Sequence, residues 1–241
     1  TQAKTLFPYT TLFRSLNAGN NCGIDNNGIV KCTSLKILIT NDNTKITNVN
    51  NLTLLENLNA SGNNCGINDT SIVECINLKI LNARSNQNIT TVNSLTQLEF
   101  LRADGNCGIN DDGIAKCTNL KQLYVSDNPD ITSVNHLKKL KYLDASCNSG
   151  IDDFGIIECT KLKTLIALNN EKITNVNHLS KLECLDASFN CGINDAGIIQ
   201  CTKLINLKKI RNYKITKYNK IFDNNNLDKQ YKQHKQHKQH K

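Results

Sequence analysis

The stretch CGINDDGIAKCTNLKQL, residues 107–123, recurs almost intact along this chain of 241 residues. Its second cysteine returns at spacings of 43, 42, 42 and 42 residues, at Cys32, Cys75, Cys117, Cys159 and Cys201. Self-similarity at a fixed period is the signature of a repeat protein, whose repeats bury their apolar faces only by stacking on one another. The sequence therefore predicts one elongated stack of coils.

Two shorter units make up each block, and both carry the motif Leu-x-x-Leu-x-Ala-x-x-Asn. Within this motif the second leucine and the alanine alternate with polar residues, and a period of two is typical of a short, half-buried strand. Stacking then places these strands in parallel, about 4.8 Å apart. The predicted strand centres are Leu16, Leu38, Leu58, Leu81, Leu101, Leu123, Leu143, Leu165, Leu185 and Leu207.

Over residues 16–216 this pattern resembles the leucine-rich-repeat superfamily. The short unit, N-x-x-I-T-x-V-N-x-L-x-x-L, is similar to the internalin-like class, and the long unit, N-C-G-I-N-D-x-G-I-x-x-C-T-x-L, is similar to the cysteine-containing class of F-box substrate adapters. The resemblance implies an α/β-type repeat fold. This fold is a curved right-handed solenoid with short parallel strands on its concave face and turns and short helical segments on its convex side.

The segments between the strands carry their own pattern. An asparagine follows each strand, and its amide can both donate and accept, so we expect it to bind the turn backbone of its own and the adjacent coil. The column comprises Asn21, Asn43, Asn63, Asn86, Asn106, Asn128, Asn148, Asn170, Asn190 and Asn212. We expect Ile46 and Val49 to point inward from the convex arc. Residues 113–117 suffice for one helical turn, which we expect Asp111 or Asp112 to cap.

The two ends of the chain differ from the repeats. Residues 5–15, TLFPYTTLFRS, resemble a translated sequencing adapter, so residues 1–15 are interpreted as an artefact outside the fold. Residues 203–241 hold eleven Lys and one Arg against two Asp, a net charge of +10 within a total of +8, so the rest of the chain carries −2. Residues 217–241 are predicted to be a basic, low-complexity, disordered tail.

Eleven cysteines occur, and nine of them fall in two register columns. Equivalent cysteines lie two coils apart, about 10 Å, which is too far for a disulfide. A bond within one unit, such as Cys107 to Cys117, stays open, but Ser149 replaces the first cysteine opposite Cys159 and favours buried free thiols. Unpaired thiols favour an intracellular compartment, which the sequence otherwise leaves unknown. No C-x-x-C motif occurs, and no metal site or cofactor is predicted.

The candidate binding site lies on the predicted concave face. Aromatic and aliphatic side chains cluster there among charged ones, a composition typical of interface hot spots. The candidate partner-binding residues are Phe100, Arg102, Asp104, Tyr124, Tyr142, Asp144, Ile166 and Asp186. The alternative is that half of these side chains simply cover their neighbours along the sheet.

These observations favour a non-enzymatic module that binds a protein of unknown identity through its concave face, with no small-molecule substrate. Asp144 and Asp186 lie about 10 Å apart, too far for a retaining carboxylate pair, and no phosphate loop or triad spacing occurs. One alternative, implied by the resemblance of the long units, is the substrate-recognition part of an F-box-type ubiquitin ligase adapter. Another is binding of nucleic acid or acidic membrane through residues 203–241.

Overall fold

The described part of the chain, residues 13–217 of a computed structural model, is a stack of coils joined by one parallel sheet. Its ten strands follow one another in chain order, so every strand pairs with the strands of the preceding and following coils. Residues 1–12 and 218–241 lie outside the described residues, and with them most of the predicted artefact and tail.

The strands are three residues each, and their register confirms the ten predicted centres. Every central leucine pairs with the central leucine of the next strand, as Leu101 does with Leu123. The strands are β1 (Ser15–Asn17), β2 (Ile37–Ile39), β3 (Asn57–Asn59), β4 (Ile80–Asn82), β5 (Phe100–Arg102), β6 (Gln122–Tyr124), β7 (Tyr142–Asp144), β8 (Thr164–Ile166), β9 (Cys184–Asp186) and β10 (Asn206–Lys208). Ser15, the last residue of the predicted artefact, therefore lies in the sheet.

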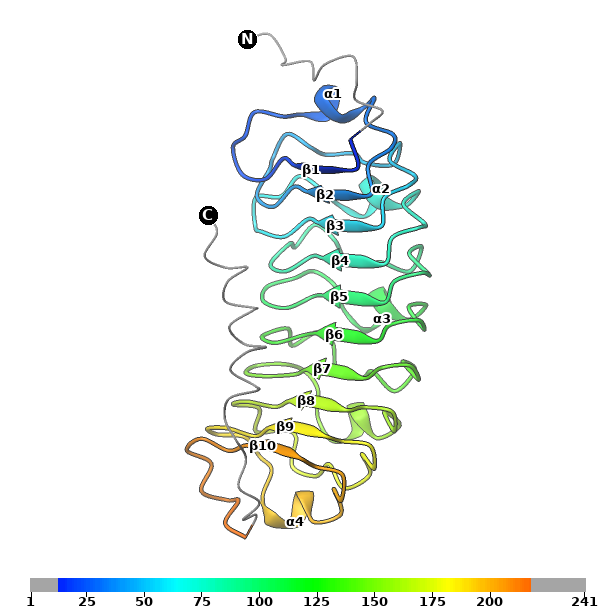
Figure 1. The fold of residues 1–241 in the computed structure, drawn as a ribbon. Helices are drawn as coiled ribbons and strands as arrows, with labels where there is room; N and C mark the ends of the chain where they lie inside the picture. Colours follow the sequence, from blue (N-terminus) through cyan, green and yellow to red (C-terminus); the bar gives the residue numbers. More distant parts are fainter. Residues whose placement is uncertain (1–12, 218–241) are drawn as a thin grey trace.

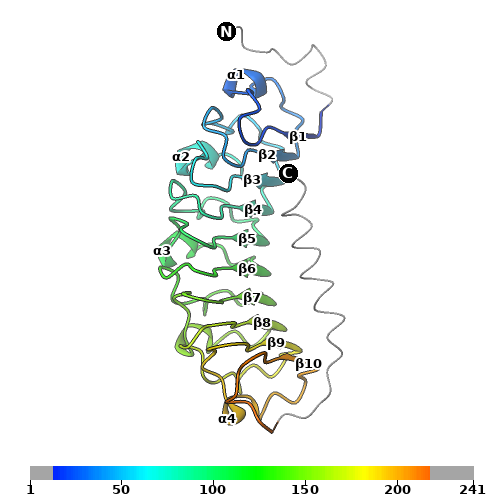
Figure 2. The same cartoon turned by 90° about the vertical axis from the view of Figure 1, so that its left-hand side faces the viewer.

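The side of the stack opposite the strands carries one short helix in each long unit (Figures 1 and 2). These helices are α1 (Asn26–Ile29), α2 (Asp69–Ile72), α3 (Asp111–Ile114), the 3₁₀ turn η2 (Phe154–Ile156) and α4 (Asp195–Ile198). Figure 2 shows the stack bowed, with the strands on its inner side. Strands on the concave face and short helical segments on the convex side are the predicted arrangement.

The core runs as columns through the stack. From β2 to β9 each central leucine is buried together with the residue two positions later, as Leu101 and Ala103 show. The convex arc adds Ile and Val, and Ile46 and Val49 are fully buried as predicted. Burying a leucine or isoleucine side chain stabilises a fold by about 1.5–3 kcal/mol, so these columns hold the coils together.

The helix caps differ from the prediction. Asn110, with extended backbone at φ −118°, caps α3 by accepting a hydrogen bond from the Gly113 N–H at 2.9 Å, so the prediction of Asp111 or Asp112 is wrong. Asp111 is already the first helical residue, and its carboxylate turns to the next coil instead. It accepts from the backbone N–H of Thr132 at 2.8 Å and from the Thr132 hydroxyl at 2.6 Å. The acidic residue thus joins two coils rather than capping its own helix.

Only alternate members of the asparagine column are buried. The Asn128 side chain donates to the carbonyl oxygens of Ala103 at 2.8 Å and Ile109 at 3.0 Å, both in the preceding coil. The buried members are Asn43, Asn86, Asn128, Asn170 and Asn212, and the exposed ones are Asn21, Asn63, Asn106, Asn148 and Asn190. The expectation that all ten bind turn backbone is therefore wrong for the long units.

The long units fill the same part of the interior with a smaller side chain. Cys65, Cys107, Ser149 and Cys191 are buried there, one or two residues after the exposed asparagine. The Cys65 thiol lies 3.4 Å from the carbonyl oxygen of Thr40 and donates to it. A small thiol or hydroxyl thus takes the place of the amide, and the asparagine stays at the surface.

We expect Asn128→Ala to lower the free energy of unfolding by about 2–3 kcal/mol, because two buried carbonyls lose their donor. The matched control Asn106→Ala removes an exposed asparagine from the neighbouring coil and should change that free energy by less than about 0.5 kcal/mol. Urea unfolding measures both values. Equal losses in the two variants would contradict the assignment of the buried asparagine as the bond between coils.

Candidate functional site

Three aromatic side chains from successive strands meet on the concave face. Phe100 on β5, Tyr124 on β6 and Tyr142 on β7 form what we call the aromatic cluster. The ring centroids of Phe100 and Tyr124 lie 5.3 Å apart, and those of Tyr124 and Tyr142 lie 4.9 Å apart. Tilted rings at these separations attract one another, so the cluster is a packed unit and not three separate side chains.

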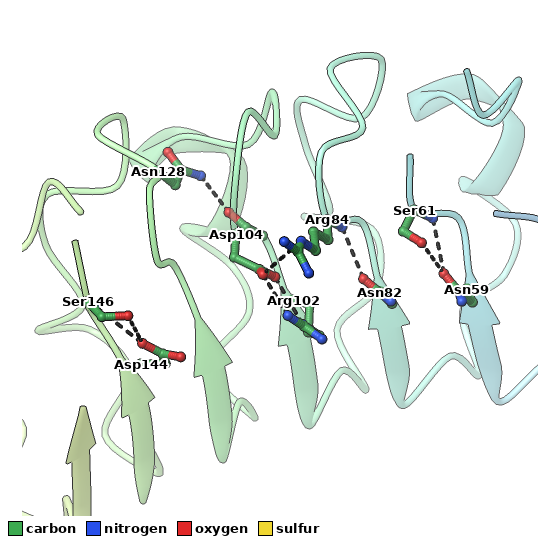
Figure 3. A network of polar contacts seen from close by, with 10 residues as sticks. Asn59, Ser61, Asn82, Arg84, Arg102, Asp104, Asn128, Asp144 and Ser146 are labelled. Atoms are coloured by element: carbon green, nitrogen blue, oxygen red, sulfur yellow. Dashed lines mark hydrogen bonds and ion pairs between the residues drawn. The ribbon is translucent and has the colours of Figure 1, made fainter. Parts of the chain in front are cut away.

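A charged group adjoins this cluster. The Arg102 guanidinium carbon lies 5.3 Å from the centre of the Tyr124 ring, and its Nε and Nη2 donate to the two carboxylate oxygens of Asp104 at 3.0 and 2.6 Å. Arg84, which sequence reasoning missed, adds an ion pair to Asp104 at 3.4 Å (Figure 3). The fork-shaped contact fixes Arg102 in place beside the aromatic rings.

Half of the eight candidate residues are buried, although they lie on the concave face. The exposed fractions are 5% for Tyr124, 5% for Asp104, 3% for Ile166 and 1% for Asp186. Tyr124 is flanked by the other two rings and by Arg102, since side chains on strands about 4.8 Å apart cover one another. The half-buried members, Phe100, Arg102, Tyr142 and Asp144, form what we call the accessible patch.

The Asn and Asp residues that directly follow a central leucine have a local role that sequence reasoning missed. The Asp144 carboxylate accepts hydrogen bonds from the Ser146 N–H at 3.2 Å and its hydroxyl at 2.6 Å (Figure 3). Asn59 and Asn82 accept from the backbone N–H two residues later in the same way, both at 3.1 Å. Such bonds from an Asn or Asp oxygen to nearby backbone shape a turn. The turn needs an oxygen atom but no charge.

The carboxylates of Asp144 and Asp186 lie on this face where water has little access. Burial among its neighbours raises the pKa of Asp144, and the hydrogen bonds from Ser146 oppose that rise. Asp186 accepts from the Ser188 N–H at 3.1 Å through Oδ1, while no donor among the described residues makes a hydrogen bond to Oδ2. Lys208 Nζ lies 3.3 Å from this oxygen, close enough for an ion pair but not aligned to donate.

Ion pairs join neighbouring coils through the residues that directly precede the strands. Lys36 and Lys79 both pair with Glu56 and lower the pKa of that carboxyl group to about 2. Lys121 pairs with Glu99 at 2.8 Å, and Lys163 pairs with Glu183 at 2.7 Å. Exposed pairs of this kind contribute little to stability, because solvent screens them.

All eleven cysteines are free thiols. Eight are buried, and the Cys117 thiol donates to the Val92 carbonyl of the neighbouring coil at 3.5 Å. Burial raises the pKa of Cys117 to about 11, and the same holds at Cys75, Cys107, Cys159, Cys191 and Cys201. Residues 13–217 contain no group of three or more His, Cys, Asp or Glu side chains that could hold a metal ion.

Comparisons with known proteins find no matching family model and no matching curated protein. Solved structures do match. An internalin (inlF) from Listeria monocytogenes is 21% identical at a TM-score of 0.53, over 78% of this chain and 68% of the internalin. The chain has the leucine-rich-repeat fold. Two further structures with this fold are the TLR13–ssRNA13 complex, 18% identical at a TM-score of 0.56 over 83% of this chain, and the Drosophila Toll–Spatzle complex, 18% identical at 0.53 over 78%.

The leucine-rich-repeat stack covers only 32% of the TLR13 chain and 31% of the Toll chain, so the likeness concerns the fold. Within the part of the chain that the structure describes, no helix is long and apolar enough to cross a membrane.

We expect only Cys22, Cys147 and Cys184 to react quickly with a disulfide reagent in the native protein at pH 8, with the exposed Cys22 the fastest. The other eight thiols are buried, and the raised pKa values leave almost no thiolate. Absorbance of the released thiol in native and unfolded protein measures the two classes. More than three fast thiols in the native state would contradict this burial.

We expect Asp144→Asn to raise the melting temperature at pH 7 by a few degrees, measured at high salt to screen distant charges. The folded-state pKa of Asp144 is raised, so ionisation favours the unfolded state and costs stability above that pKa. The gain should vanish below the ordinary pKa of Asp, about 3.9, where the carboxyl is neutral in both states. A lower melting temperature at pH 7 would contradict this sign, and exposed Asp130→Asn serves as the control.

Proposed function

We propose that this chain is a binding module that recognises a protein partner through the accessible patch on its concave face. The observation that carries the proposal is the preordered arrangement of Phe100, Tyr142 and Arg102. The rings pack on Tyr124, and the guanidinium is held in two hydrogen bonds to Asp104. Aromatic and arginine side chains supply most of the energy in many interfaces.

Preordering matters because fixing a flexible side chain in an interface reduces the binding free energy by about 0.5–1.5 kcal/mol, through lost conformational entropy. Phe100 and Tyr142 are partly accessible, yet contacts with their neighbours already restrict them. A partner that covers them gains apolar burial without that full cost. Asp144, at the margin of the rings, would select partners that present a donor or a positive charge opposite it.

A protein fits this patch better than a nucleic acid does. Arg102, the one basic residue of the accessible patch, is already paired with Asp104, and Asp144 is acidic, so the patch suits phosphate poorly. Toll has been seen with Spatzle and TLR13 with ssRNA13, and these complexes support a ligand-binding role for a chain with the same fold. Nucleic acid or acidic membrane binding through 203–241 and an F-box-type adapter remain alternatives to test.

We expect the double variant Phe100→Ala/Tyr142→Ala to weaken partner binding at least about 100-fold, because two anchors of about 2 kcal/mol each are removed. The partner is first captured with the wild-type chain, and its dissociation constant is then measured by calorimetry. Ile37→Ala, a similar apolar truncation at the same register position on β2, is the matched control and should bind normally. Equal affinity for all three proteins would overturn the proposal.

A further inference from the structure

The residues that directly precede the strands change their charge pattern at Lys141. In the first coils a lysine follows a glutamate and a glutamate follows a lysine, and Glu56 pairs with the lysines on both sides of it. From β2 to β8 this column reads Lys36, Glu56, Lys79, Glu99, Lys121, Lys141 and Lys163. The alternation therefore stops at position 141, where a glutamate would continue it.

Three lysines consequently stand next to one another in successive coils. The Lys141 N–H donates to the carbonyl oxygen of Lys121 at 2.8 Å, and the Lys163 N–H donates to that of Lys141 at 2.9 Å. Like charges on neighbouring strands, about 4.8 Å apart, destabilise a sheet. Lys121 and Lys163 each have an outer glutamate, but among residues 13–217 no acidic side chain forms an ion pair with Lys141. Stacking of the coils thus does not explain a lysine at this position.

A second column of lysines lies beside the first. The motif Lys-Leu-Lys occurs at residues 139–141 and again at 161–163, and in both cases the leucine is buried while the lysines are exposed. We call Lys139, Lys141, Lys161 and Lys163 the lysine cluster. Within the described chain Lys163 alone of the four has an ion pair, with Glu183, while Lys139 donates to the neutral side chain of Asn119 at 2.6 Å. The cluster is therefore an exposed site of concentrated positive charge.

The lysine cluster borders the accessible patch. Lys141 directly precedes Tyr142, the first residue of β7, and Asp144 ends the same strand. At about 3.3 Å per residue, Lys141 and Asp144 lie about 10 Å apart along the chain, with the Tyr142 ring between them. A ligand that covers this ring meets positive charge on one side and negative charge on the other. This order of charges can fix the direction in which a partner binds.

An acidic protein surface fits both features together. Its carboxylates can pair with the lysines, and a neighbouring apolar side chain can cover the ring. A nucleic acid in the same place would bring phosphate groups against Asp144, which repels them. A flat lipid surface does not reach side chains on the inner side of the bowed stack, where Figure 2 shows the strands.

We propose that the partner of the accessible patch is acidic, with carboxylates that pair with the lysine cluster while an apolar side chain covers Phe100 and Tyr142. The apolar contact rests on the proposed function, and the lysine cluster adds the charge and the orientation of the partner. A lysine at position 141 costs the stack an ion pair on each side. Proteins retain such unfavourable groups where binding requires them.

An oligoglutamate peptide that ends in tryptophan is the probe for this proposal, and the same peptide with glutamine is its neutral counterpart. The chain contains no tryptophan, so the fluorescence of the peptide reports binding directly. At low salt we expect the wild type to bind the glutamate peptide about tenfold more tightly than the glutamine peptide. This preference should disappear at about 1 M salt, where the Debye length is about 3 Å.

Lys141→Glu separates binding from folding. It should reduce the preference to less than about twofold, yet raise the melting temperature by about 1–2 °C, because the new glutamate completes the alternation of charge. Lys45→Glu, the same substitution at an exposed lysine of another coil, is the matched control and should keep the preference. Lys139→Gln/Lys161→Gln tests the second column and should lower the preference without affecting the melting temperature.

The outcomes distinguish this proposal from the proposed function. Phe100→Ala/Tyr142→Ala should weaken binding of both peptides equally and keep the preference; no effect on either peptide would reject the aromatic anchors and leave the acidic specificity standing. A preference that survives in Lys141→Glu would overturn the proposal, since the basic residues 203–241 would then hold the peptide. No binding of the glutamate peptide, or tighter binding of a single-stranded oligonucleotide or of phosphatidylserine vesicles that Lys141→Glu abolishes, would overturn it as well.

Discussion

Each coil of this protein is too short to satisfy its own turn backbone, and the structure depends on how the next coil does so. The Asn128 amide reaches back to two carbonyls of the preceding coil, and equivalent asparagines repeat the contact every second coil. Unpaired buried carbonyls would cost more than the net gain of the bonds themselves. This requirement fixes the register of the coils, and the register decides which side chains face the core and which lie on the concave surface.

The sequence alone predicted the strands residue by residue, because a period of two and a fixed repeat length assign every position to a face. It could not predict how deeply each side chain is buried. Asn106 and Asn128 occupy the same place in the motif, yet only Asn128 is buried, because Cys107 fills the interior of the long unit. The cap at Asn110 was missed for a similar reason, since the choice among three adjacent polar residues depends on where the helix begins.

The candidate site shows the same limit. Sequence register placed Phe100, Tyr124 and Tyr142 on one face, and the structure brings their rings together. Exposure was mispredicted for Tyr124 because it depends on the size of side chains on the neighbouring strands, which a single repeat does not contain. Arg84 entered the site through a contact to Asp104 from an adjacent coil, and pairwise electrostatics of this kind need coordinates.

The concave face combines stabilising and destabilising features. Packed rings and the Arg102–Asp104 pair fix the geometry, whereas Asp144 and Asp186 keep charges where a neutral amide would complete the same turn. Binding surfaces often retain such groups at a cost in stability, because a ligand of the opposite charge can satisfy them. The neutral amides of Asn17, Asn59 and Asn82 lie towards the N-terminal end of the face, and the carboxylates of Asp144 and Asp186 lie towards its C-terminal end.

Cysteine scanning of one strand tests the central claim, that register position determines burial. Residues 80–84 of β4 and its turn are replaced one at a time, as Ile80→Cys, Leu81→Cys, Asn82→Cys, Ala83→Cys and Arg84→Cys. The account predicts rapid labelling of the introduced thiol at positions 80, 82 and 84 and protection at 81 and 83, where the native side chains are fully buried. Uniform labelling, or protection at position 82 with labelling at 81, would contradict it.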